Sequence, residues 1–328
     1  MNHQGKFSRQ VAALVCAIAL GAPLGAALAA QESPTPAVTM APGVLVGSDQ
    51  QGSVAWIADA EGRVTSINLN DGKVRWRSAT DGLPLAQLGQ QLVVLARPKG
   101  PGQLSLLLIN PEDGTAQGGL IGNLPDGVLA SPDPQPNRLF KAIANSEAGM
   151  LKIQWSYVDW PLRGAILKQD LVNGRKRREL GGMIWVDFAA SRMQVISDAD
   201  LPSVRTPDLI GDARIAGVEG VQFRAADDVY AQVSTAVSDD LLGTQWRWTV
   251  HERASGRSVA NLILPYANAP FLVRAGQLLW QSQPLVVREA SGGYASYAAR
   301  LVALDLRSGR ELWSADVLDG TYRGVLPP

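Results

Sequence analysis

The chain alternates, over most of its length, between short apolar runs and clusters of turn-forming residues. Runs such as Leu92–Ala96, Leu104–Ile109 and Leu151–Val158 are rich in Leu, Val and Ile and are bounded by Gly, Pro, Asn or Asp. Segments of this length and composition are typical of β-strands, and few windows show the period of an amphipathic helix. The pattern therefore predicts an all-β protein.

Five glycines stand in nearly the same sequence neighbourhood. Each has an acidic or amide residue four positions before it, an Asp, Asn or Ser directly before it, and an apolar residue eight positions before it. Glycine accepts the positive φ of a tight turn, and Asp, Asn or Ser bond to the local backbone there. Five β-hairpins in one register indicate a structural repeat. The glycines are Gly72, Gly114, Gly174, Gly256 and Gly309.

The length of the repeat favours a β-propeller. The spacing from Gly72 to Gly114 matches the roughly 40 to 50 residues of a four-stranded blade, and the interval from Gly174 to Gly256 has room for two. A sixth turn is therefore expected between Asp198 and Gly217. We predict one propeller domain over residues 43–328, with six antiparallel blades, or seven, closed by strands from both ends of the chain. A β-sandwich or a solenoid explains the short repeat less simply.

Two of the repeats place a tryptophan four residues after the glycine. The sequence Leu304-Asp305-x-x-x-Gly309-Arg310-x-x-Trp313, and its counterpart from Asn68 through Gly72 to Trp76, resemble the tryptophan-docking motif of quinoprotein-like propellers. The resemblance implies a ring of four-stranded blades in which each tryptophan is wedged against a neighbouring blade. The match is partial in the other three repeats, where the tryptophan is replaced by Gly118, Arg178 and Ala260.

The family contains large dehydrogenases that hold pyrroloquinoline quinone and smaller binding propellers, one of which serves outer-membrane protein assembly. The dehydrogenases are similar to one another in having a vicinal cysteine pair and a calcium ion beside the quinone. This chain has a single cysteine, Cys16, and is much shorter. The resemblance therefore implies the non-catalytic branch, without a cofactor, although fold by itself does not settle function.

The N-terminus has the layout of a secretory signal peptide. Lys6 and Arg9 precede an apolar run from Val11 to Leu20, and Ala27-Leu28-Ala29 fits a small-x-small cleavage site. A membrane anchor is the alternative, but Gly21, Pro23 and Gly25 interrupt the run that would have to span the bilayer. We expect residues 1–30 to be removed in the periplasm, and residues 31–42, rich in Pro, Thr, Ser and Ala, to form a linker. No second segment is long enough to cross a membrane.

The residue inventory excludes several kinds of site. Without the leader the chain has no cysteine, and His251 is its one histidine, which rules out disulfides and zinc sites built on several Cys or His ligands. The chain has 30 basic and 30 acidic residues, so loss of Lys6 and Arg9 leaves a net charge of about −2, which does not favour nucleic acid. The carboxylate pairs Asp198/Asp200, Asp227/Asp228 and Asp239/Asp240 are more typical of solvated loops than of glycosidase or calcium sites.

Two segments are candidates for partner binding. Aromatic side chains are common anchors of interfaces, and a basic run can dock an acidic partner or anionic lipid head groups. Packing between blades and a solvated hairpin are the alternatives. We predict a non-catalytic, monomeric, periplasmic scaffold that binds protein partners in envelope or outer-membrane protein assembly. The alternative is a small-molecule binder or an enzyme, quinone-dependent or carbohydrate-active, that uses a central channel. The candidate residues are Trp155, Tyr157, Trp160, Arg175, Lys176, Arg177 and Arg178.

Overall fold

The computed structural model of the chain describes residues 37–131, 138–147, 150–159, 178–197, 222–226, 229–239, 243–252, 254–264, 269–274, 276–282, 285–288 and 294–318. These residues form strands, turns and bends, with no helix among them, so none of them provides a helix that could cross a membrane. Every strand pairing is antiparallel, as in the β1–β2 and β21–β22 pairs. The prediction of an all-β protein is confirmed.

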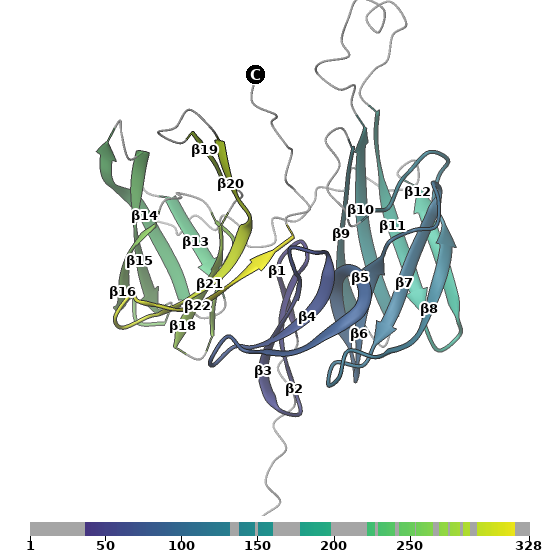
Figure 1. Cartoon of the computed structure of the whole chain (residues 1–328), viewed down its shortest axis with the longest axis horizontal. Helices are drawn as coiled ribbons and strands as arrows, with labels where there is room; N and C mark the ends of the chain where they lie inside the picture. Colours follow the sequence, from purple (N-terminus) through teal and green to yellow (C-terminus); the bar gives the residue numbers. More distant parts are fainter. Residues whose placement is uncertain are drawn as a thin grey trace, which may run out of the picture. The chain divides into compact units, whose positions relative to one another are not determined.

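The first eight strands form one antiparallel sheet in chain order. The long strand β5 pairs with β4 up to Asp81 and with β6 from Gly82 onward. Register shifts in both pairings accompany the curvature of β5 in Figure 1. The sheet therefore contains two four-stranded units that share β5, with β1 added beside β2. The strands are β1 (Val38–Ala41), β2 (Val44–Asp49), β3 (Gly52–Ala58), β4 (Arg63–Asn68), β5 (Val74–Leu88), β6 (Gln91–Ala96), β7 (Gln103–Ile109) and β8 (Ala116–Asn123).

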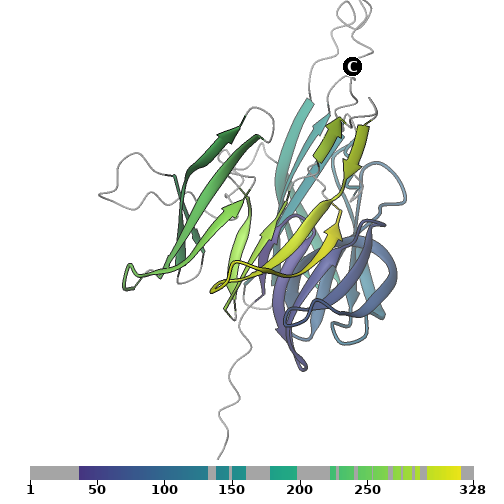
Figure 2. The same cartoon turned by 60° about the vertical axis from the view of Figure 1, so that its left-hand side comes forward.

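Three further four-stranded sheets follow, each with its strands adjacent in chain order. The last of them has a hairpin, β19–β20, inserted between its second and third strands, and its final two strands are drawn in yellow in Figure 2. The strands are β9 (Arg138–Glu147), β10 (Met150–Asp159), β11 (Arg178–Asp187), β12 (Arg192–Ser197), β13 (Gln222–Ala226), β14 (Val229–Asp239), β15 (Gly243–Glu252), β16 (Ser258–Leu264), β17 (Phe271–Arg274), β18 (Gln277–Gln281), β19 (Leu285–Arg288), β20 (Tyr294–Tyr297), β21 (Ala299–Asp305) and β22 (Glu311–Val317).

The described part of the chain thus holds five four-stranded units, compared with the six predicted blades. The predicted sixth turn, between Asp198 and Gly217, lies outside the described residues. The linker predicted for residues 31–42 is too long at its C-terminal end. Val38–Ala41 form β1, and the side chains of Met40 and Ala41 are buried, because they pack into the same core as β2.

Tight turns with glycine at positive φ connect the third and fourth strands of four units. The φ angles are 70° at Gly72, 76° at Gly114, 69° at Gly256 and 68° at Gly309. In each turn the glycine N–H donates to the carbonyl oxygen of the acidic or amide residue four positions earlier, at 2.8 to 2.9 Å. The sequence repeat therefore marks one structural position, the hairpin that ends each of these units.

Gly174 does not belong to this register, which corrects its assignment to the repeat. It lies outside the described residues, in the connection between β10 and β11, which are the second and third strands of their sheet. The equivalent turn of this sheet runs from Asp187 to Arg192, with Ser191 at φ 51° in the glycine position. Asn-Gly-Arg at residues 173–175 resembles the repeat in sequence, because these residue types are common in turns whichever strands the turns connect.

The two repeat tryptophans make the same contact with different units. Trp76, in β5, donates its indole N–H to the carbonyl oxygen of Pro111 at 2.8 Å, and its ring lies 2.5 Å from where a Cβ on Gly114 would stand. Trp313, in β22, donates to the carbonyl oxygen of Leu69 at 2.8 Å and lies equally close to a Cβ on Gly72. Each tryptophan therefore docks from a fourth strand onto the repeat turn of another unit, and only glycine leaves room for it.

Buried apolar side chains form three core clusters. The first joins β1–β4 to strands from β14 to β22, the second joins strands from β5 to β11, and the third lies between β2–β5 and β6–β7. The largest fully buried side chains include Trp56, Trp248, Tyr157 and Phe271. Each such side chain contributes on the order of 2 to 3 kcal/mol through burial, so the packing of sheet on sheet holds these units together.

Candidate partner-binding surface

Trp155 and Tyr157, predicted as partner-binding residues, are core residues. Their exposed fractions are 2% and 1%, and both belong to the second core cluster. The Trp155 ring stacks on Phe140, with 6.0 Å between centroids and 18° between planes. Because side chains alternate across a strand, all the odd-numbered positions from Leu151 to Tyr157 face this core. The prediction that these two aromatics anchor a partner is therefore wrong.

The other predicted binding residues lie at the edge of the described chain or beyond it. Trp160, Arg175, Lys176 and Arg177 fall outside the described residues. Arg178 is the first residue of β11, where its backbone pairs with that of Asp159 at the end of β10. The basic run and Trp160 thus belong to one connection, which leaves β10 and enters β11 at the same end of the sheet. Their role stays a prediction.

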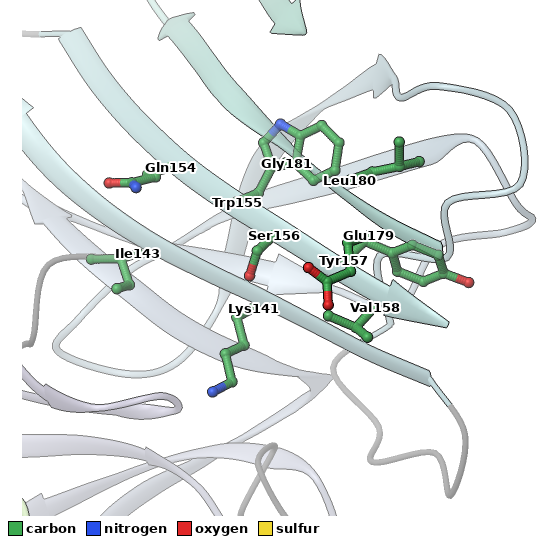
Figure 3. Close-up of a pocket in the computed structure, with 10 residues that line it drawn as sticks. All are labelled: Lys141, Ile143, Gln154, Trp155, Ser156, Tyr157, Val158, Glu179, Leu180 and Gly181. Atoms are coloured by element: carbon green, nitrogen blue, oxygen red, sulfur yellow. The ribbon is translucent and has the colours of Figure 1, made fainter. Parts of the chain in front are cut away.

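The opposite face of β9–β11 carries a shallow hollow of about 200 Å³ (Figure 3). Lys141, Ser156 and Glu179 lie on one side of the strands in the close-up, whereas Trp155 and Leu180 lie on the other. The even-numbered side chains from Lys152 to Val158, Gln154 among them, are half-buried here. The alternation of polar and apolar residues in β10 marks this face in the sequence, whereas the predicted binding residues of β10, Trp155 and Tyr157, lie on the other face.

The electrostatics of this face are mixed. The Lys152 ammonium lies 4.5 Å from the centre of the Trp185 ring, a cation–π contact that covers part of the indole. Arg138 and Asp159, paired across β9 and β10, form an ion pair at 3.7 Å near the end of the sheet. The amide, hydroxyl, ammonium and carboxylate groups on this face can form hydrogen bonds to a polar partner surface.

Two buried ionic clusters elsewhere have structural roles. The Asp59 carboxylate accepts bonds from the N–H groups of Glu61 and Arg63 and from the Thr65 hydroxyl, each at 3.0 Å, and pairs with Arg77 at 2.9 Å. These contacts hold the turn between β3 and β4. The second cluster, Arg75 with Asp49 and Glu112, ties the end of β2 to the turn between β7 and β8.

His251 is likewise structural. Its ring stacks on Tyr230 at 4.9 Å, and Nδ1 lies 3.1 Å from the carbonyl oxygen of Gly256 in the repeat turn. Among the described residues, no group of three His, Cys, Asp or Glu side chains could hold a metal ion. The carboxylate pairs Asp198/Asp200 and Asp227/Asp228 lie outside the described residues, as does Asp240.

In two of the sheets the connections at the two ends differ in length. Turns between first and second strands, and between third and fourth strands, are tight, as at residues 50–51 and 69–73. The connections between second and third strands leave from the opposite end, because the strands are antiparallel. Two of these are long, residues 160–177 between β10 and β11, and residues 282–298, which include β19 and β20. Long connections on a rigid scaffold are the usual carriers of binding residues.

No family model matches the chain, and no curated protein matches it. Solved structures to which the chain is similar include an uncharacterized protein from Listeria monocytogenes EGD-e, the propeller of Dos1, and Sqt1 from Saccharomyces cerevisiae. Their sequence identities are 10%, 8% and 9%, and their TM-scores are 0.27, 0.25 and 0.22. The matches cover 88%, 84% and 87% of this chain and 84%, 68% and 86% of those chains. At such low scores these similarities carry no argument about function.

Proposed function

We propose that the chain is a closed propeller of five blades that serves as a non-catalytic protein-binding scaffold. The observation that carries the architecture is the equivalence of the two tryptophan contacts. Trp76 joins the first unit to the second, and Trp313 joins the last unit to the first, across 244 positions of sequence. A ring in which each fourth strand docks on the next repeat turn explains why one contact recurs at both places.

Length supports five blades over six. Residues 198–221, between β12 and β13, are too few for a further four-stranded blade of roughly 40 residues. Leu262 of β16 also supports the ring order, because it lies 3.1 Å from where a Cβ on Gly309 would stand. The fourth unit thus also contacts the repeat turn of the fifth, through a residue two positions beyond Ala260, which occupies the repeat position of the tryptophan.

The scaffold function rests on two sheets, β9–β12 and β17–β22, that have tight turns at one end and a long connection at the other, the open end. The long connections, with Trp160 and the basic run Arg175 to Arg178, start from the open end of their sheets. In a closed ring these ends gather on one side and form a broad binding surface. The signal-peptide pattern at residues 1–30 supports a periplasmic location, and we propose a protein partner of acidic character in envelope or outer-membrane protein assembly.

A quantitative pull-down from periplasmic extract tests this function. We expect the wild-type chain to enrich a defined protein, and a variant with Arg175, Arg177 and Arg178 changed to Glu to lose it at unchanged thermal stability. A control variant, Arg307→Glu, alters an exposed arginine in a tight turn and should retain the partner. Equal enrichment by all three proteins would argue against the open end as the binding surface. Turnover of a sugar or an alcohol by the purified chain would overturn the non-catalytic proposal.

A further inference from the structure

The outer strand β8 (Ala116–Asn123) departs from the way proteins guard the edges of their sheets. It is the last strand of its eight-stranded sheet, and among the described strands it pairs with β7 alone, along one side. Its sequence, AQGGLIGN, contains no charged residue and no proline, and none of its side chains is buried. Exposed edges are normally protected by charges, prolines or coverage, because their free N–H and C=O groups pair readily with another strand.

The other described fourth strands are guarded or packed. The first half of β5 carries Arg75 and Arg77, β12 begins with Arg192, and β22 carries Glu311 and Asp316. The uncharged strand β16 turns Ala260, Leu262 and Leu264 into the core instead. In β8 the repeat position of the tryptophan is Gly118, and Ile121 is 59% exposed. Leu120 packs partly against the second core cluster and Gly122 lies against Met193 of β12, but these contacts leave Ile121 and the outer edge of the strand exposed.

We infer that β8 is a self-docking edge, on which β8 of a second copy of the chain pairs antiparallel about a two-fold axis. A two-fold axis perpendicular to the sheet keeps each side chain on the same face in both copies. Even-numbered residues therefore pair with even-numbered ones and odd with odd, so one residue at the axis lies opposite the same residue of the other copy. Gln117 is the extra residue of a bulge, which places the middle of the remaining strand near Leu120. With Leu120 opposite Leu120, Gly118 stands opposite Gly122, and the amide side chains of Gln117 and Asn123 come near each other at both ends of the pair.

This register is complementary in each part of the strand. The two Leu120 side chains meet at the axis. Ile121 stands opposite Gly119 of the other copy. The Leu107 side chain of that copy lies 2.8 Å from where a Cβ on Gly119 would stand. An exposed isoleucine thus gains an aliphatic neighbour on each side of the axis. Both ends bring together amide groups that can exchange hydrogen bonds, and no like charges meet.

The size of the contact sets the expected affinity. Eight residues span about 27 Å, so the paired edges bury less than a standard interface of about 1,600 Å². We therefore expect a reversible dimer with a Kd on the order of 10 to 100 µM. Because no charged side chain lies in β8, raising the salt concentration should leave this Kd unchanged. This dimer would stand apart from the scaffold function, and it departs from the monomer that the sequence analysis predicts.

Sedimentation velocity over a range of concentrations of the mature chain tests the proposal. We expect Ile121→Lys to abolish the dimer, because a lysine protects the edge, while Leu312→Lys, at a similarly exposed residue of β22, retains it. Ile263→Lys examines the uncharged edge of β16 in the same way. A monomer at every concentration would overturn the proposal, as would a dimer that survives Ile121→Lys or is lost with Ile263→Lys.

A cysteine pair tests the register separately. In a chain without Cys16, Leu120→Cys should form a disulfide-linked dimer under mild oxidation, because the two Cα atoms would lie about 4.5 to 5.5 Å apart. Ile121→Cys should not, since its own copy is displaced along the strand. Equal crosslinking of both variants, or of neither, would reject the two-fold pairing. Both variants can be checked for unchanged thermal stability, so loss of folding is a separate observation.

Discussion

Strands β6 and β10 show two ways in which the chain builds a sheet. In β6 the consecutive residues Leu92 to Leu95 are all fully buried, because both faces of this unit are covered. In β10, from Leu151 to Val158, the odd-numbered side chains are buried and the even-numbered ones are half-buried, since described apolar side chains pack against only one face. A continuous apolar run thus marks a unit packed between two others, and alternation marks one with a polar face.

The same contrast separates whole regions of the chain. Strands β2 to β7 supply side chains from both of their faces to the three core clusters, and β18 and β21 are likewise apolar on both faces. In β14 and β15 the apolar set is Val229, Ala231, Val233, Trp248 and Val250, while Tyr230, Gln232 and Thr249 alternate with it. The two sheets with one polar face are the ones that flank residues 198–221. We therefore expect these two sheets to tolerate polar substitution on that face.

A buried acid should distinguish the two kinds of strand most strongly. Val93→Asp and Val94→Asp, on opposite faces of β6, should each cost more than about 4 kcal/mol, because each would leave an unpaired charge in a core. In β10 we expect the same for Ile153→Asp but less than about 1 kcal/mol for Gln154→Asp. Urea melts measure all four variants. Comparable losses for the two β10 variants would mean that both faces of this strand are covered.

The docking tryptophans should come next in size. Trp313→Ala and Trp76→Ala should each cost about 3 to 5 kcal/mol, because each loses a buried ring and leaves a carbonyl oxygen unpaired. Trp185→Ala, on the polar face of β11, should cost about 1 kcal/mol or less. Chemical unfolding of the three variants makes the comparison. A small effect at Trp313 alone would show that the ring is not closed between its last and first units.

The glycines beneath the tryptophans provide a matched test of close approach. Gly72→Ala and Gly114→Ala meet two penalties, a positive φ and a Cβ 2.5 Å from a tryptophan ring, and should cost about 2 to 4 kcal/mol. Gly256→Ala has the same φ but open space, and should cost about 1 kcal/mol. If thermal melts give the same loss of stability for all three variants, the cost comes from the backbone conformation and not from the contact with the tryptophan ring.

Ser191 should respond in the opposite direction. It occupies the glycine position of its turn at φ 51°, a conformation that is unfavourable for a residue with a Cβ. Ser191→Gly should therefore raise stability by about 0.5 to 1 kcal/mol. The neighbouring change Ala190→Gly serves as the control and should be neutral or slightly destabilising. If Ser191→Gly lowers stability, the serine side chain makes a contact that stabilises this turn by more than its backbone conformation costs.

The smallest effect concerns the acids of the repeat turns. The backbone N–H and the side chain of Ser308 lower the pKa of Asp305 below its usual 3.8, and the Lys73 side chain likewise lowers the pKa of Asp71. A lowered folded-state pKa gives stability that is present above pH 3.8 and is lost as the pH falls through the lowered pKa. The difference in denaturation midpoint between wild type and Asp305→Asn should therefore be present at pH 7 and shrink below pH 3.8. A difference that grows in acid would contradict this sign.

The residue pattern was a good guide to local structure. Gly72, Gly114, Gly256 and Gly309 each stand in a tight turn at positive φ, because that backbone requirement depends only on neighbours in the chain. Gly174 shares their local chemistry and not their position, since turn residues do not record which strands they connect. The equivalent turn from Asp187 to Arg192 has a serine in place of the glycine, so the glycine pattern does not mark it in the sequence.

By itself, therefore, the sequence determined the strand-rich class, the repeat turns and the two docking tryptophans, all of which depend on short-range rules. The tertiary structure decided which face of each strand is buried. Alternation in β10 separates two sets of side chains, but only packing against β5 to β7 directs Trp155 and Tyr157 inward and leaves Lys152 and Gln154 outside. Similarly, the contact of Trp313 with the Leu69 carbonyl joins the two ends of the domain. Such pairings depend on the summed packing of many side chains, which no local pattern specifies.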